Sequence, residues 1–143
     1  MAYNYFNLDH AIQTHDKIIE VSGGSTGQMD IGRLDSVLDH IQNDDYYPSF
    51  EEKTTHLVYE INKGHCFSDG NKRTSIALGA FFLEVNGLDG LVTKFIIEME
   101  NIAVSVADNL IDKQLLHEII TSIINEEHYS EELQMKIIAA LEQ

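Results

Sequence analysis

The sequence predicts an all-α fold, and three observations support this. Apolar residues recur at helical spacing, capping residue types precede most of these runs, and no stretch keeps the apolar–polar alternation of a strand. The chain has 143 residues and no low-complexity linker, so we expect a single domain over residues 1–143. A domain of this size buries roughly 70% of its unfolded surface. We therefore expect a compact bundle of six to seven helices.

Three helices are predicted in the first half of the chain. They cover about residues 8–21, 31–41 and 50–63. Asn7, Asp30 and Ser49 stand at their starts, and side chains of these types cap the free N–H groups of a first helical turn. The first helix ends at Gly23-Gly24 and the third at Lys63-Gly64, because glycine favours the helix C-terminus.

A central helix is predicted over about residues 71–86. After its first turn this segment is apolar on nearly every side, which is typical of a helix buried all round. Three more amphipathic helices are expected over about residues 93–106, 113–123 and 130–141. The last of these is an additional C-terminal helix.

Charge and composition exclude several classes of protein. The formal net charge is −15, with 24 acidic and 9 basic residues, so the surface repels nucleic acid and we expect no nucleic-acid partner. No apolar run approaches the roughly 20 residues that span a bilayer, so we expect no membrane partner. The single cysteine, Cys66, cannot form an internal disulfide, and no leader segment opens the chain. These features predict a cytoplasmic protein.

The segment from His65 to Thr74 concentrates reactive groups. An imidazole, a carboxylate, an amide and two cations stand directly around a predicted helix start. The free N–H groups of a helix N-terminus bind phosphate oxygens, and Gly70 lets a ligand approach the backbone. Arg73 can grip phosphate through its planar fork, whereas Lys72 offers a mobile charge. We therefore expect Gly70, Asn71, Lys72 and Arg73 to bind the phosphates of a nucleotide.

Two further roles follow from this segment. The carboxylate of Asp69 would repel bound phosphates unless a cation lay between them, so we expect Asp69 to bind Mg²⁺. The alternative for Asp69 is a simple helix cap. His65 follows the third helix and is a candidate general base for an attacking hydroxyl. The alternative for His65 is an ordinary helix C-terminal histidine.

The remaining cysteine and histidines suggest no separate site. Cys66 is next to His65 in the chain, but adjacent side chains point apart and rarely form a nucleophile and base pair. The other histidines lack the spacing of zinc ligands, and we expect most of them on the surface. They are His10, His15, His40, His56, His117 and His128.

The pattern His65-x-Phe67-x-Asp69-Gly70-Asn71-x-Arg73 resembles the signature of the Fic/Doc family. Lys72 resembles the Doc, or death-on-curing, toxin branch, because adenylylating Fic enzymes have a second glycine there. Gly70 departs from the Doc toxin, which has Ala, and is common in other Fic motifs. The resemblance extends from about Phe6 to Asn125.

The resemblance implies a helical Fic fold and a protein-modifying transferase. A Doc-like enzyme would move the γ-phosphate of ATP, or of another nucleotide triphosphate, to a Ser or Thr hydroxyl of a target such as a translation factor, with elongation factor Tu suggested. His65 would activate the hydroxyl, Asp69 would hold Mg²⁺, and residues 70–73 would cradle the phosphates. The alternatives are AMP transfer on the same scaffold and an inactive module that binds a nucleotide or partner. A separate antitoxin is also implied.

Two more features come from the family pattern. The connection over about residues 42–48 would be a flap that holds the target segment as an added strand, with Tyr46 and Tyr47 as candidate contacts. The alternative is that these tyrosines cover the core. Residues 122–127 resemble an inhibitory helix except at the last position, which makes Glu126 a candidate inhibitory residue. The alternative for Glu126 is a solvated helix end.

Overall fold

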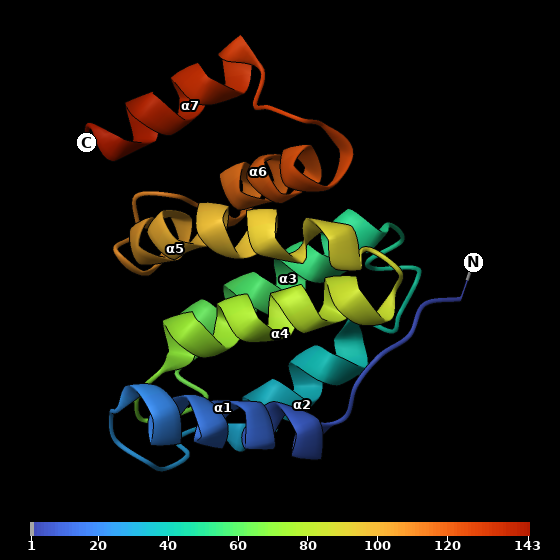
Figure 1. Cartoon of the computed structure of the whole chain (residues 1–143), viewed down its shortest axis with the longest axis vertical. Helices are drawn as coiled ribbons and strands as arrows, with labels where there is room; N and C mark the ends of the chain where they lie inside the picture. Colours follow the sequence, from blue (N-terminus) through green and yellow to red (C-terminus); the bar gives the residue numbers. More distant parts are fainter. Residues whose placement is uncertain (1) are drawn as a thin grey trace.

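Helices α3 and α4 form the centre of the molecule (Figure 1). The computed structural model describes residues 2–143. Its elements are α1 (Leu8–Ser22), α2 (Ile31–His40), α3 (Phe50–Lys63), α4 (Asn71–Val85), the 3₁₀ helix η1 (Asp89–Leu91), α5 (Val92–Ala107), α6 (Lys113–Asn125) and α7 (Glu131–Leu141). No strand occurs within these residues, and their one β-type pairing is an isolated bridge between Gln28 and Phe67. The predicted all-α fold is confirmed.

The helices pack in layers around this centre. Helices α1 and α2 lie on one side of α3 and α4, α5 and α6 lie on the other, and α7 packs on α6 (Figure 1). Gly79 permits close packing of α4, since a Cβ atom there would lie 2.8 Å from the Phe95 ring and 2.9 Å from Val58. The predicted central position of α4 is therefore confirmed.

Local capping explains where most helices begin. At five N-termini the side chain of the capping residue accepts a backbone N–H from the first turn. These caps are Asn7, Asp30, Ser49, Asp112 and Ser130. Helix α4 differs, because its N-cap is Gly70 in the left-handed conformation (φ 83°) and no side chain caps it. Among the described residues, no helix combines the length and apolar character needed to cross a membrane.

Candidate functional site

His65 occupies a sharp turn between α3 and α4. Its φ angle is 51°, a left-handed conformation in which histidine is among the more frequent non-glycine residues. The residue before it is Gly64. A larger residue would not fit at this position, because a Cβ atom there would lie 2.5 Å from Nε of Arg33. His65 is exposed, whereas the next two residues enter the core. The turn therefore presents the imidazole to solvent from a fixed backbone.

Cys66 and Phe67 anchor the loop. Both are fully buried, and burial raises the pKa of the Cys66 thiol to about 11. A thiol with this pKa is protonated at neutral pH and is a poor nucleophile. The Phe67 ring stacks on His15 with ring centroids 3.7 Å apart. Phe67 therefore fastens the loop to α1, in agreement with a purely structural role.

The side chain of Asn71 holds the same loop. Its Nδ2 donates to the carbonyl oxygen of Phe67 (2.9 Å), and its Oδ1 accepts the backbone N–H of Phe67 (3.1 Å). Both polar groups of this amide are thus occupied. The backbone N–H groups of Asn71, Lys72 and Arg73 donate to no acceptor within residues 2–143. Any contact of Asn71 with a phosphate would therefore use its backbone and not its side chain.

Asp69 lies beside this helix start and is held by two backbone amides. Its Oδ2 accepts from Ser25 N–H (3.0 Å) and its Oδ1 from Gly70 N–H (2.8 Å). These two bonds, followed by the charges of Arg73 and Lys72, hold the pKa of Asp69 below its usual range. Asp69 is not the N-cap of α4, because Gly70 takes that position. The carboxylate is therefore ionised at neutral pH. The side chain of Asp69 is 46% exposed.

The two cations of the first turn differ in their surroundings. Nη1 of Arg73 donates to the carbonyl oxygen of Gly23 (2.8 Å), and Nη2 lies 3.8 Å from Oδ1 of Asp69. Lys72 is exposed. Lys63, a third cation near the motif in sequence, instead donates to the side chain of Asn109. The first turn of α4, where the sequence predicts an anion site, thus carries two cations, Lys72 and Arg73.

The donor set fits Mg²⁺ only together with a nucleotide. Within residues 2–143 no group of three His, Cys, Asp or Glu side chains gathers to hold a metal. Mg²⁺ is commonly bound by one or two carboxylates plus phosphate oxygens and water. Asp69 offers a hard, ionised oxygen ligand beside the free amides of α4. These residues therefore fit an ion that shares its ligands with bound phosphates.

Two contributors to the site were missed by sequence reasoning. The glycine loop, residues 23–27, contacts Asp69 and Arg73, although its composition indicates only an ordinary loop. His15 donates from Nε2 to the carbonyl oxygen of Asp69 (2.7 Å) and is fully buried.

Two of the other histidines, His15 and His56, are buried. The expectation that most of the other histidines are surface residues was therefore wrong for these two, because tertiary packing covers them.

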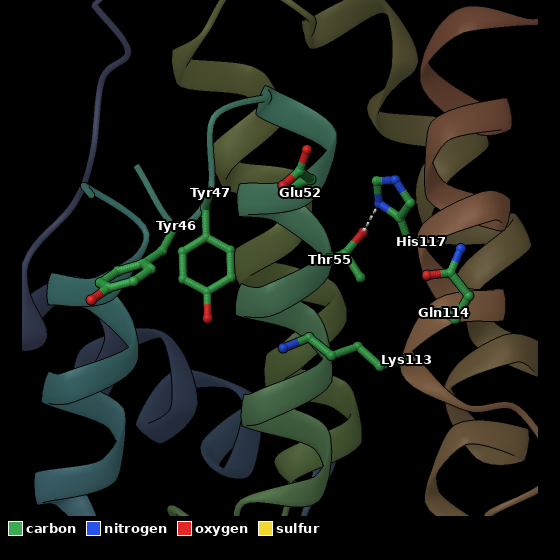
Figure 2. Close-up of a pocket in the computed structure, with 7 residues that line it drawn as sticks. All are labelled: Tyr46, Tyr47, Glu52, Thr55, Lys113, Gln114 and His117. Carbon is green, nitrogen blue, oxygen red and sulfur yellow. Dashed lines mark hydrogen bonds between the residues drawn. The ribbon is translucent and has the colours of Figure 1, made fainter. Parts of the chain in front are cut away.

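Tyr46 and Tyr47 lie at the opposite end of α3 from His65. Residues 42–48 form hydrogen-bonded turns without a strand, and the β-bridge to the motif comes from Gln28 instead. In Figure 2 the Tyr47 ring lies beside α3, whereas the Tyr46 ring extends away from it. Both tyrosines line a groove that crosses α3 toward α6. Its volume is about 450 Å³, and it is lined by Tyr46, Tyr47, Glu52, Thr55, Lys113, Gln114 and His117. Tyr47 stacks on His56 (centroids 4.3 Å apart), whereas Tyr46 is 75% exposed.

Glu126 lies at the C-terminal end of α6, where the chain turns toward α7. Its backbone N–H donates to the carbonyl oxygen of Ser122 (2.9 Å), and its carbonyl oxygen accepts from Lys94 (2.6 Å). Its side chain forms no ion pair with Arg73 within the described part of the chain. In Figure 1 this corner of the molecule lies on the other side of the α3–α4 layer from α1.

Comparison with known proteins identifies the family. The sequence model of the Fic/DOC family matches residues 5–83. "Protein kinase doc" of Escherichia phage P1 is 34% identical over 88 residues, which cover 59% of this chain and 69% of that relative. "Toxin Doc" of Mycolicibacterium smegmatis (strain ATCC 700084 / mc(2)155) is 34% identical over 70 residues, which cover 46% of this chain and only 54% of that relative. The chain belongs to the Fic/DOC family.

Proposed function

We propose that this chain is a Doc-like phosphotransferase that moves the γ-phosphate of a nucleotide triphosphate to a Ser or Thr hydroxyl of a target protein. One observation carries the proposal most directly. The uncapped N-terminus of α4, with three free backbone amides and Arg73, lies beside an ionised carboxylate and one short loop away from an exposed imidazole. This arrangement supports phosphate binding at the helix start, Asp69 as a metal ligand and His65 as the base.

The proposed reaction uses each of these groups once. The amides of residues 71–73, together with Lys72 and Arg73, bind the phosphate oxygens and orient the γ-phosphorus. His65 accepts the hydroxyl proton while the hydroxyl oxygen forms a bond to that phosphorus. The bond to the bridging β–γ oxygen breaks, and the nucleoside diphosphate leaves with the bonding electrons. Mg²⁺ held through Asp69 would offset the negative charge on the phosphates.

Two features favour transfer of the γ-phosphate over transfer of AMP. Position 72 is Lys, as in the Doc branch, and one matching relative is named a protein kinase. AMP transfer remains the second candidate, because Gly70 is the residue common in Fic motifs. Gly70 has a φ angle of 83°, a conformation that glycine adopts without strain. Gly70 therefore has a structural explanation that does not depend on the kind of group transferred.

The biological setting is proposed from the same relatives. We infer a toxin restrained by a separate antitoxin, acting in the cytoplasm, with a translation factor as the target. One matching relative carries the name "Toxin Doc". We also propose that residues 1–143 act as one domain. The flap role of Tyr46 and Tyr47 and the inhibitory role of Glu126 remain predictions, and the observed positions of these residues lend them no direct support.

The decisive experiment labels a cell lysate with ATP that carries an isotope at either the α or the γ phosphorus, in the presence of Mg²⁺. Protein label from γ alone is the expected result. Label from α would replace the proposal with AMP transfer. Absence of transfer from both, together with measurable ATP binding, would favour a nucleotide-binding module without activity.

A further inference from the structure

The glycine loop holds two of the charged side chains at the start of α4, those of Asp69 and Arg73, from one side. Ser25 N–H donates to Oδ2 of Asp69 (3.0 Å), and the carbonyl oxygen of Gly23 accepts from Nη1 of Arg73 (2.8 Å). The side chains of Asp69 and Arg73 nevertheless stay 46% and 39% exposed. The backbone contacts therefore fix their orientation while their other faces remain open to solvent.

Gly24 makes this approach possible. A Cβ atom at this position would lie 2.7 Å from Oδ2 of Asp69, 2.9 Å from Cδ1 of Ile19 and 3.0 Å from Nη2 of Arg73. Its φ angle of 126° is also one that other residues rarely adopt. Glycine is thus required at position 24 for two separate reasons, and one of them is the space occupied by the two charged groups.

His15 holds the main chain of the same turn. Its Nε2 lies 2.7 Å from the carbonyl oxygen of Asp69, and its Nδ1 lies 3.0 Å from the carboxylate of Asp16. The ring is fully buried and stacks nearly parallel on Phe67. A carbonyl oxygen only accepts, so Nε2 is the donor in that bond. Asp69 is therefore held through both its backbone and its side chain.

We propose that His15, Gly23, Gly24 and Ser25 form a positioning shell that orients Asp69 and Arg73 for Mg²⁺ and nucleotide phosphates. This inference rests on the proposed function. Groups that bind a metal or a phosphate must be held close to their productive geometry by a supporting set of contacts. Here the supporting groups come from the middle of α1 and from the loop that follows this helix. They lie about 50 residues before the motif in sequence, with separations of 54 for His15 and Asp69, 44 for Ser25 and Asp69, and 50 for Gly23 and Arg73.

The loop itself supplies a matched control. Gly27 has a φ angle of 120°, close to that of Gly24, so an alanine at either position meets a similar backbone strain. At Gly27, however, a Cβ atom would meet only the Ser68 side chain, with Oγ at 3.1 Å. The difference between Gly24→Ala and Gly27→Ala therefore separates the crowding of Asp69, Arg73 and Ile19 from the backbone strain of the loop.

The experiment measures the affinity of both variants for Mg²⁺-ATP by calorimetry and their melting temperatures without ligand. We expect Gly24→Ala to weaken binding by about 10- to 100-fold, the usual cost of losing a supporting contact, while Gly27→Ala stays near the native affinity. Equal affinities in the two variants would overturn the proposal. Tighter binding by Gly24→Ala would also overturn it, because the loop would then compete with the ligand.

Two additional measurements keep the test informative. His15→Gln retains a donor for the Asp69 carbonyl, whereas His15→Phe retains only a flat ring against Phe67, so we expect the Gln variant to bind Mg²⁺-ATP more tightly. Equal affinities would remove His15 from the shell. Without ligand, the Ser25 amide should exchange its hydrogen faster in Gly24→Ala than in Gly27→Ala. A native chain that binds no Mg²⁺-ATP would instead contradict the proposed function, before any variant is compared.

Discussion

Two polar clusters close to α3 are stabilised in different ways. At the motif, the charges of Asp69 and Arg73 are met largely by backbone groups of a loop, and both side chains remain partly exposed. At the second cluster, around His56 and Glu60 of α3, side chains satisfy one another: Lys113 contacts His56 (2.8 Å) and Glu60 (3.6 Å). Glu60 also accepts from Arg33 (2.6 Å).

This difference separates partly exposed groups, which can still bind a ligand, from groups in close side-chain pairs. Asp69 and Arg73 face each other at 3.8 Å, whereas Arg33 and Glu60 approach to 2.6 Å. A backbone amide or carbonyl orients a charged side chain without neutralising its charge, so the site retains its attraction for phosphate and metal. Opposite side chains that pair with each other cancel most of their field. We therefore expect changes at the motif to alter chemistry, and changes at the cluster around His56 and Glu60 to alter mainly stability.

The largest effect is expected at His65. His65→Asn keeps a residue that tolerates a positive φ angle, and it should reduce phosphate transfer by a factor of about 10² to 10⁴, because a general base is lost. Melting temperature and ATP affinity should stay near native values. His128→Asn, at an exposed position, is the control. An unfolded His65→Asn variant would show that His65 serves the fold and not the reaction.

Asn71 belongs to the motif, but its side chain should also contribute to the stability of the fold. Asn71→Ala leaves the backbone N–H and C=O of buried Phe67 without their partners, which costs about 1–3 kcal/mol for each unsatisfied group. We expect a clear fall in the free energy of unfolding, measured by urea denaturation. Asn71→Asp keeps the acceptor and loses the donor, so it should be less destabilising. If Asn71→Ala is as stable as the native chain, the two hydrogen bonds between Asn71 and Phe67 do not contribute to stability.

The cluster around His56 should make the free energy of unfolding depend on pH. Burial, followed by the charge of Lys113, lowers the pKa of His56 from 6.5 to about 4, with Glu60 opposing and His40 assisting the shift. Between these values the unfolded chain binds a proton that the folded chain does not, so stability should decrease as pH falls from 6.5 toward about 4. Urea denaturation at several pH values measures this slope.

His56→Phe tests the assignment of that slope. The variant keeps a ring to stack on Tyr47 and removes the titrating group, so its stability should change less over the same interval. The carboxyls of Asp44, Glu60 and Asp69 have lowered pKa values in the fold, so their protonation should add a loss of stability that begins below about pH 5 and overlaps the acidic part of this interval. An unchanged slope in His56→Phe would assign the pH dependence to other groups.

The smallest effect is expected at Tyr46. Because its side chain is 75% exposed, Tyr46→Ala should change the free energy of unfolding by less than about 0.5 kcal/mol. Tyr47→Ala should cost more, since it removes a stacked ring contact worth about 0.5–1.5 kcal/mol. If Tyr46→Ala raises the KM for a protein target without altering stability, the flap role predicted for this segment gains its first support.

Sequence reasoning succeeded where the signal is local. Caps such as Asn7 and Ser49 act within four residues, and amphipathic spacing is visible in any short window. The motif itself is also contiguous, so its place between two helices could be predicted. The start of α5 was less clear, because its N-cap is Leu91, which has no capping oxygen, and the preceding 3₁₀ helix has only three residues.

Contacts between distant segments could not be predicted in the same way. His15 lies 54 residues from Asp69, and nothing in its own neighbourhood distinguishes it from an exposed histidine on an amphipathic helix. The full burial of Lys53, which donates to the carbonyl oxygen of Ile41 and to Asp44, is equally invisible in the sequence. The motif could therefore be located from sequence, whereas the groups that orient it required the tertiary structure.

The burial of Cys66 has a practical consequence. Its thiol has no exposed surface and a pKa of about 11, so thiol-selective reagents should leave it unmodified while the chain is folded. The folded native chain thus serves as a background without a reactive cysteine for site-specific labelling. A fluorophore attached at Thr26→Cys, in the exposed part of the glycine loop, could report changes in that loop when nucleotide is added, without any need to alter the motif.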